Sequence, residues 1–96
     1  MQATLKDRID QIIQKGLKDG RTDLEVLPNG HVCGHVVSSE FERLDFEERR
    51  KRIRVLLGEA VDAGHLLDSD LKRVSTLLTY TPDEWSIATS DLASDN

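Results

Sequence analysis

A tight turn between two strand-like runs constrains the fold of this chain more than any other feature. Pro28-Asn29-Gly30 joins the run Thr22–Leu27 to the run His31–Ser39. Proline presets its own φ, and asparagine and glycine tolerate positive φ, so the three residues favour a turn. Leu24 and Val26 lie on one face of the first run. The pattern predicts a β-hairpin in the first half of the chain.

Helical periodicity flanks this hairpin. On one stripe of the opening segment lie Leu5, Ile9, Ile12, Ile13 and Leu17. The spacing predicts a helix that stops before Gly20. After the hairpin, Asp45 with Glu48 three residues later forms a capping-box pattern that opens a second helix ending near Gly64. We expect its buried face to hold Phe46, Ile53, Leu56, Leu57 and Ala60.

The last third of the chain adds a strand and a helix. A short helical turn is expected after Asp68, and Val74–Tyr80 is predicted to be the third strand. Thr81 is placed to cap a final short helix, with Pro82 in the first turn and Glu84 reaching back. The predicted order is α-β-β-α-(α)-β-α, an α+β sandwich of helices on one small sheet.

Length and composition limit the classes of protein. With 96 residues the chain has room for one domain, predicted over residues 1–88, followed by a polar, disordered tail at 89–96. Apolar residues make up 38% and charged residues 32%, as in ordinary soluble domains. The first residues lack the apolar stretch of a signal peptide, and no apolar run could span a bilayer. A single cysteine forms no internal disulfide, so we predict a cytoplasmic protein without a membrane partner.

A candidate metal site lies in the second strand, where His31, Cys33 and His35 alternate. Neighbouring positions on one strand face are about 6.6 Å apart and the outer pair about 13 Å, so all three cannot bind one ion. A site would need two adjacent members plus ligands from elsewhere, and His65 is the only other histidine. The favoured interpretation is a strand, with Cys33 as a small buried hydrophobe and the histidines on a half-exposed face.

A basic run on the second helix is a candidate nucleic-acid site. Its members are Arg49, Arg50, Lys51, Arg52 and Arg54. Such a cluster could neutralise several phosphates of DNA, with strongly salt-dependent binding. The net charge of −5 and the expected i,i+4 pairs Glu47–Lys51 and Glu48–Arg52 favour a self-paired, solvated helix face instead.

Catalysis is not indicated. Cys33 would need a base that lowers its pKa, and no third orienting group accompanies the flanking histidines. Trp85 and Phe46 are interpreted as core anchors rather than stacking platforms. We therefore predict a protein that is not an enzyme and has no small-molecule substrate.

Three segments together resemble the BolA family. Val37–Arg43 reads VSSEFER and Arg49–Ile53 reads RRKRI, at the spacing of the family pattern V-S-x-x-F-x-G-x-x-x-x-x-R-H-R-x-V/I. Thr79–Trp85 reads TYTPDEW, similar to the family's T-x-T-P-x-x-W. The resemblance extends over about Leu5–Ala88. It implies an α+β, BolA-like fold related to the class II KH arrangement, with helices packed on a small three-stranded mixed sheet.

The resemblance also implies a role in iron and iron–sulfur homeostasis. Members of the family bind monothiol glutaredoxins and share a bridging two-iron two-sulfur cluster, and some are described as DNA-binding regulators. His31 occupies the position of one family ligand, while Arg73 replaces the histidine expected as the second. Because arginine offers no lone pair to iron, a second ligand would have to be Cys33 or His65. The family's F-x-G glycine and R-H-R histidine are also replaced, by Arg43 and Arg50. No cluster is expected in the isolated chain.

Overall fold

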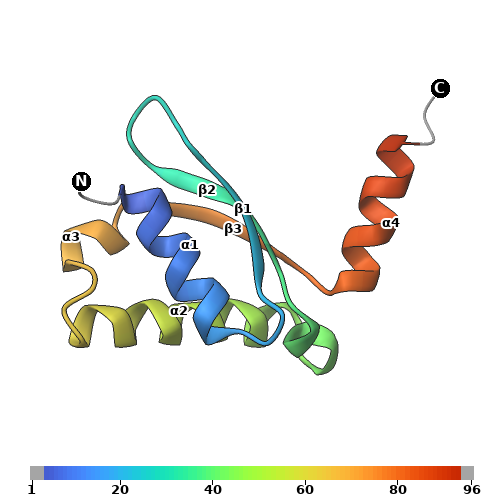
Figure 1. Ribbon diagram of the computed structural model, residues 1–96, viewed down its shortest axis with the longest axis horizontal. Helices are drawn as coiled ribbons and strands as arrows, with labels where there is room; N and C mark the ends of the chain where they lie inside the picture. Colours follow the sequence, from blue (N-terminus) through green and yellow to red (C-terminus); the bar gives the residue numbers. More distant parts are fainter. Residues whose placement is uncertain (1–3, 94–96) are drawn as a thin grey trace.

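The structure is a computed structural model that describes the backbone of residues 4–93 and the side chains of residues 4–89 (Figure 1). Its elements are α1 (Leu5–Gly16), β1 (Arg21–Val26), β2 (Val32–Val37), the 3-10 helix η1 (Ser39–Arg43), α2 (Phe46–Asp62), α3 (Asp68–Leu71), β3 (Val74–Tyr80) and α4 (Pro82–Ala93). The predicted order is confirmed, with η1 as the one element that the sequence pattern did not indicate.

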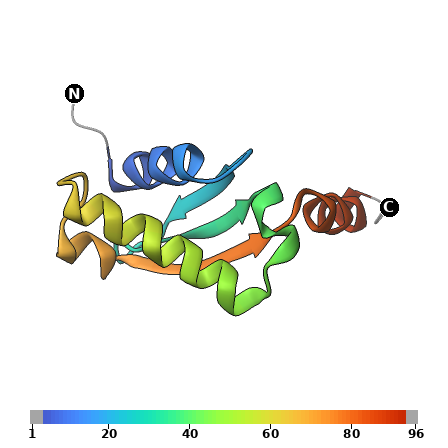
Figure 2. The same ribbon diagram turned by 90° about the horizontal axis from the view of Figure 1, so that it is seen from below.

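The three strands form one mixed sheet in the order β1-β2-β3. β1 and β2 are antiparallel, as a hairpin requires, and β2 and β3 are parallel. Helices α1 and α2 cover one face of this sheet, whereas α4 extends away from them beyond the end of β3 (Figures 1 and 2). Neither α1 nor α2 covers the other face of the sheet.

The core lies between the sheet and these two helices. Ile9 and Ile13 of α1 and Ile53 of α2 are buried against it, together with Val32 and Val36 of β2. Cys33 and His35 alternate with these valines and are only half-buried, so strand periodicity assigned the two faces of β2 correctly.

Gly34 lets β1 and β2 approach each other closely at the middle of the hairpin. Its φ is +145°, and a Cβ added there would lie 2.1 Å from the carbonyl oxygen of Asp23. Only glycine adopts this backbone conformation without strain. Position 34 is therefore fixed by the geometry of the central strand.

Both predicted helix caps are confirmed. The Glu48 amide donates to Asp45 Oδ1 at 2.8 Å, and the Asp45 amide donates to Glu48 Oε1 at 3.2 Å. At the start of α4 the Thr81 amide donates to Glu84 Oε1 at 2.8 Å, and the Glu84 amide donates to Thr81 Oγ1 at 3.1 Å. Reciprocal bonds of this kind satisfy amides that have no partner within the helix.

Two expectations were wrong. Phe46 is 68% exposed rather than a core anchor, because it is the first residue of α2 and lies beyond the core. Helix α4 continues through Ala93, so residues 89–93 are helical rather than part of a polar tail. The Thr89 hydroxyl donates to the Trp85 carbonyl at 2.9 Å inside that helix. The last three residues of the predicted tail, 94–96, lie outside the described residues.

Candidate functional site

The two positions that the family resemblance pointed to meet at one end of the sheet. The turn holds the backbone of His31, since its amide donates to Asn29 Oδ1 at 3.0 Å and its carbonyl accepts from the Leu27 amide at 2.7 Å. One residue later, the Val32 amide donates to the Arg73 carbonyl at 2.8 Å. Residues 31 and 73 therefore lie at neighbouring positions where the parallel strands begin.

The side chains at this end of the sheet provide one metal-binding donor. His31 is half-buried and carries an imidazole, which can bind iron through a ring nitrogen. Arg73 is exposed and carries a guanidinium, which has no acceptor lone pair. The pair fits a site with a single ligand from this chain and does not fit a site with two.

Cys33 lies on the face of the sheet opposite α1 and α2 and is half-buried, so its interpretation as a buried hydrophobe was wrong. It pairs with Glu25 of β1, and its thiol donates to Glu25 Oε1 at 3.6 Å. Partial burial, and then the adjacent carboxylate, raise the pKa of the Cys33 thiol. Because iron binds the thiolate, both effects oppose ligation by this residue.

His65 lies in the connection between α2 and α3, where its amide donates to the Ala60 carbonyl at 2.8 Å. Its side chain lines a groove between α1 and α2, beside Arg8 and Lys15. His65 is thus on the helical side of the molecule, whereas Cys33 is on the opposite face of the sheet. Within residues 4–89, no three His, Cys, Asp or Glu side chains come together to hold a metal ion.

The structure divides the basic run of α2 into structural and exposed members. Arg49 is only 6% exposed, and its Nε donates to the carbonyls of Phe41 at 3.2 Å and Leu44 at 3.0 Å. Its two terminal nitrogens bind the Glu84 carboxylate at 2.8 and 3.3 Å. Arg49 therefore links η1, α2 and α4 through its hydrogen bonds. Its assignment as a nucleic-acid contact was wrong.

Arg52 is also occupied, although by a different partner from the one expected. Its Nε donates to Glu40 Oε2 at 2.6 Å, and one terminal nitrogen donates to the Gly16 carbonyl at 3.1 Å. The predicted Glu48–Arg52 pair is absent because Glu48 serves the helix cap, and no Glu47–Lys51 pair forms among the described side chains. The Arg52 hydrogen bond lowers the pKa of Glu40.

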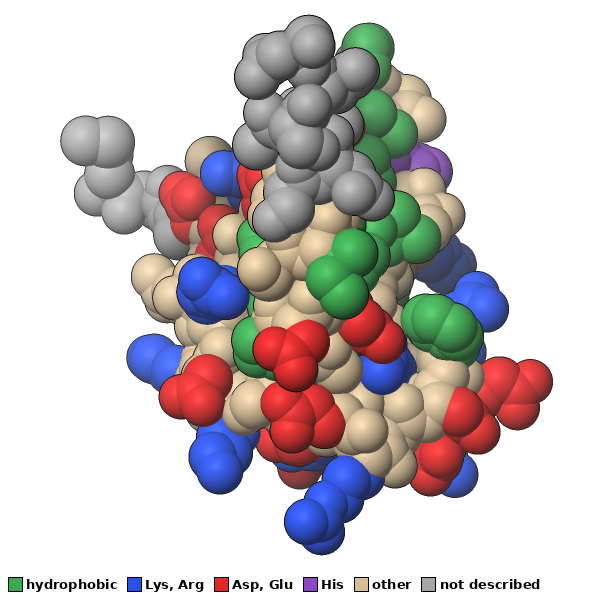
Figure 3. Space-filling model, turned by 90° about the vertical axis from the view of Figure 1, so that its right-hand side faces the viewer, with side chains coloured by type: hydrophobic (Ala, Val, Ile, Leu, Met, Phe, Trp, Pro, Cys, Tyr) green, Lys and Arg blue, Asp and Glu red, His purple; other side chains and the backbone are tan. Residues whose placement is uncertain are grey.

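Three cations of the run remain exposed, namely Arg50, Lys51 and Arg54. On the side of the molecule where α4, η1 and the start of α2 face the viewer, acidic and basic side chains are interspersed (Figure 3). On this side of the molecule, the mixture provides no continuous basic surface of the kind that DNA binding uses.

An aromatic cluster joins α4 to the open face of the sheet. The rings of His35, Tyr80 and Trp85 lie with centroids 5.2 to 5.7 Å apart in tilted arrangements. The sequence pattern placed His35 on a half-exposed face, as observed, but its prediction of Trp85 as a core anchor was wrong, because Trp85 is half-buried outside the core and packs on His35 and Tyr80. It could not show that His35 and Trp85 meet, because they are fifty positions apart in the chain (85 − 35).

The Arg49–Glu84 pair predicts a pH dependence of stability. The Arg49 hydrogen bonds, and then the Thr81 amide, lower the pKa of Glu84 from its ordinary value of 4.5. The stabilising contribution of Glu84 is therefore present above about pH 4.5 and is lost as the pH falls through its folded-state pKa. Because Glu84 is 43% exposed, we expect no more than about 1 kcal/mol.

Urea unfolding of the native chain and Glu84→Gln, which keeps an acceptor for the cap, measures this contribution. We expect the variant to be less stable near neutral pH and equal to the native chain once Glu84 is protonated. A difference that persists unchanged in acid would show that the charge of Glu84 is not the source.

Comparison with known proteins agrees with this geometry. No family model and no curated protein matches the chain. Among solved structures, the fold matches that of a BolA protein homologue from Coxiella burnetii, with 31% sequence identity and a TM-score of 0.64. The match covers 90% of this chain and 99% of the homologue.

The class of protein is therefore a BolA-like α+β domain, with a three-stranded mixed sheet and two helices packed on one face. The chain belongs to the BolA family. Within the described residues, no helix combines the length and apolar character needed to cross a membrane.

Proposed function

We propose that this protein is a non-catalytic accessory protein of iron and iron–sulfur homeostasis, which acts in the cytoplasm by binding a monothiol glutaredoxin. The observation that carries the proposal is the placement of His31 beside Arg73 at the start of the parallel strands. In a member of the BolA family, this end of the sheet corresponds to the positions that the sequence resemblance assigns to cluster ligands. The raised pKa of Cys33 further supports a non-catalytic role, because a nucleophilic thiol needs a lowered pKa.

The residue at the second ligand position determines whether the complex with glutaredoxin can also share a cluster. Arg73 contributes a permanent positive charge there and no electron pair. Neither alternative ligand is well placed, because partial burial and then Glu25 raise the pKa of the Cys33 thiol, and His65 lies on the helical side. The association that we propose therefore does not depend on a bridging two-iron two-sulfur cluster, and His31 is the one candidate ligand that this chain retains at the site.

Restoring a histidine at position 73 tests this proposal. The native chain, Arg73→His and the double variant His31→Ala/Arg73→His are each mixed with a monothiol glutaredoxin, under anaerobic cluster reconstitution. We expect all three to bind apo-glutaredoxin in a calorimetric titration. In visible circular dichroism, only Arg73→His is expected to give a spectrum that differs from that of glutaredoxin alone, because only this variant offers two imidazoles.

Arg43→His serves as the matched control, since it places a new histidine at an exposed position in η1. It should leave the spectrum of the mixture unchanged. Failure of the native chain to bind any monothiol glutaredoxin would contradict the proposed partner. A distinct cluster spectrum from the native chain would contradict the proposed role of Arg73 alone.

A further inference from the structure

The outer strand β3 has an unprotected edge. β1, at the other edge of the sheet, carries the charged residues Arg21, Asp23 and Glu25. β3 reads VSTLLTY and contains neither a charged residue nor a proline, which are the usual safeguards of a sheet edge. A register irregularity opposite Val32–Gly34 affects only the first half of β3. The second half, Leu77–Tyr80, pairs regularly with β2.

The free side of β3 presents backbone hydrogen-bonding groups. The Tyr80 carbonyl accepts from the Ser38 amide at 3.0 Å, so the polar groups of Tyr80 face β2. Since these groups alternate along a strand, the amides and carbonyls of Leu77 and Thr79 face away from β2. Among the described residues, neither amide donates a backbone hydrogen bond to a turn, loop or helix cap.

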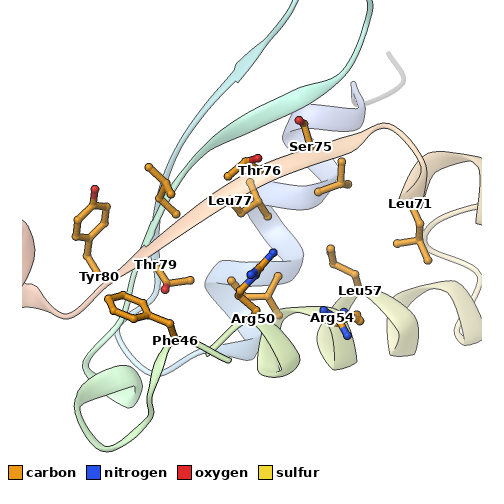
Figure 4. Close-up of a pocket in the computed structure, with 13 residues that line it drawn as sticks. Phe46, Arg50, Arg54, Leu57, Leu71, Ser75, Thr76, Leu77, Thr79 and Tyr80 are labelled. Carbon is orange, nitrogen blue, oxygen red and sulfur yellow. The ribbon is translucent and has the colours of Figure 1, made fainter. Parts of the chain in front are cut away.

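A groove of about 610 Å³ runs along this edge, between β3 and α2. Its walls are apolar, with Ile53, Leu57 and Leu77 among the lining residues, and Arg50 and Arg54 of α2 also line it (Figure 4). Neither guanidinium forms an ion pair or a hydrogen bond with the described side chains, unlike those of Arg49 and Arg52.

We propose that this groove binds an extended peptide that presents apolar and acidic side chains on the same face, and that adds to the sheet as a strand beside β3. The backbone groups of Leu77 and Thr79 that face away from β2 supply the pairing, and the apolar walls take up the apolar side chains on the peptide face turned toward α2. Arg50 and Arg54, in a chain with a net charge of −5, select carboxylates on that same face of the partner.

The same charges argue against other occupants. A second copy of the chain paired edge to edge would bring two pairs of arginines together, and juxtaposed like charges disfavour association. Single-stranded nucleic acid uses a basic groove along its whole backbone, whereas only two cations line this one. The peptide-binding site is independent of the glutaredoxin proposed above.

The probe is the N-acetylated, C-amidated heptapeptide Val-Thr-Glu-Thr-Val-Thr-Glu, in which valine and glutamate share one strand face, compared with the peptide that has lysine in place of each glutamate. Binding is measured by calorimetry with the native chain and with Arg50→Glu/Arg54→Glu. The control, Lys18→Glu/Lys51→Glu, changes the net charge equally at exposed positions outside the groove. Hydrogen exchange measures whether the peptide protects the amides of Leu77 and Thr79.

We expect the groove variant to bind the glutamate peptide at least about tenfold more weakly and to prefer the lysine peptide. The control should bind the glutamate peptide like the native chain, and the peptide should slow exchange of the two β3 amides. Absence of binding to the native chain, equal weakening in both variants, or unchanged exchange of Leu77 and Thr79 would overturn the proposal. Tighter binding of an oligothymidylate of about ten nucleotides, with the same dependence on Arg50 and Arg54, would assign the groove to nucleic acid instead.

Discussion

Replacing Arg49 with alanine is expected to lower the free energy of unfolding by about 3 kcal/mol. The substitution removes the donor to the Leu44 carbonyl and one of two donors to the Phe41 carbonyl, which keeps its hydrogen bond from the Leu44 amide, and it removes both hydrogen bonds to Glu84. Since Glu84 is 43% exposed, solvent screens the ion pair itself. We expect the larger part of the loss to come from the unsatisfied Leu44 carbonyl and from the volume of the buried side chain.

Arg50→Ala is a matched control, because it removes the same side chain one position later on the exposed face of α2. Its expected effect is within about 0.5 kcal/mol. Urea unfolding followed by the fluorescence of Trp85, the only tryptophan, measures both variants. Similar losses in the two variants would mean that Arg49 contributes no more than a surface residue.

Arg49 also shows why part of the candidate site could not be predicted from the sequence. The sequence pattern groups it with the four other cations of the basic run. Its partners are the carbonyls of Phe41 in η1 and of Leu44 just after it, and the Glu84 carboxylate thirty-five positions away (84 − 49). Local patterns contain no information about such contacts.

The elements themselves were predictable because their signals are local. The turn at Pro28-Asn29-Gly30, the caps at Asp45 and Thr81, and the alternation along β2 each depend on residues within a few positions of one another. Phe46 illustrates the limit of this approach. It has the right spacing for the apolar stripe of α2, but the core ends before the first turn of that helix.

The meeting of residues 31 and 73 is a different case. The two positions were associated through resemblance to a family, and the structure places them side by side through the Val32–Arg73 backbone hydrogen bond. Parallel pairing of β2 with β3 could not be derived from periodicity, which does not specify strand order or direction. Cys33 was a candidate because it neighbours His31 on one strand face, and His65 because it is the only other histidine outside that strand.

Gly34→Ala is expected to have the second large effect, lowering the free energy of unfolding by about 3 kcal/mol or more. The added Cβ would lie 2.1 Å from the Asp23 carbonyl oxygen and 2.8 Å from Leu24 Cα, both backbone atoms that cannot move without parting the strands. The positive φ of 145° adds strain that no rearrangement of side chains relieves.

Gly58→Ala makes the same chemical change with the opposite expected sign. Nothing lies within 4 Å of a Cβ added at Gly58, which is inside α2, so alanine should raise the free energy of unfolding by about 0.5–1 kcal/mol. If Gly34→Ala alone does not fold, the substitution can be measured in the Gly58→Ala background. A loss below about 1 kcal/mol at position 34 would show that β1 can separate from β2 at little cost. The close approach at Asp23 would then not be what holds Cys33 and His35 on the open face of the sheet.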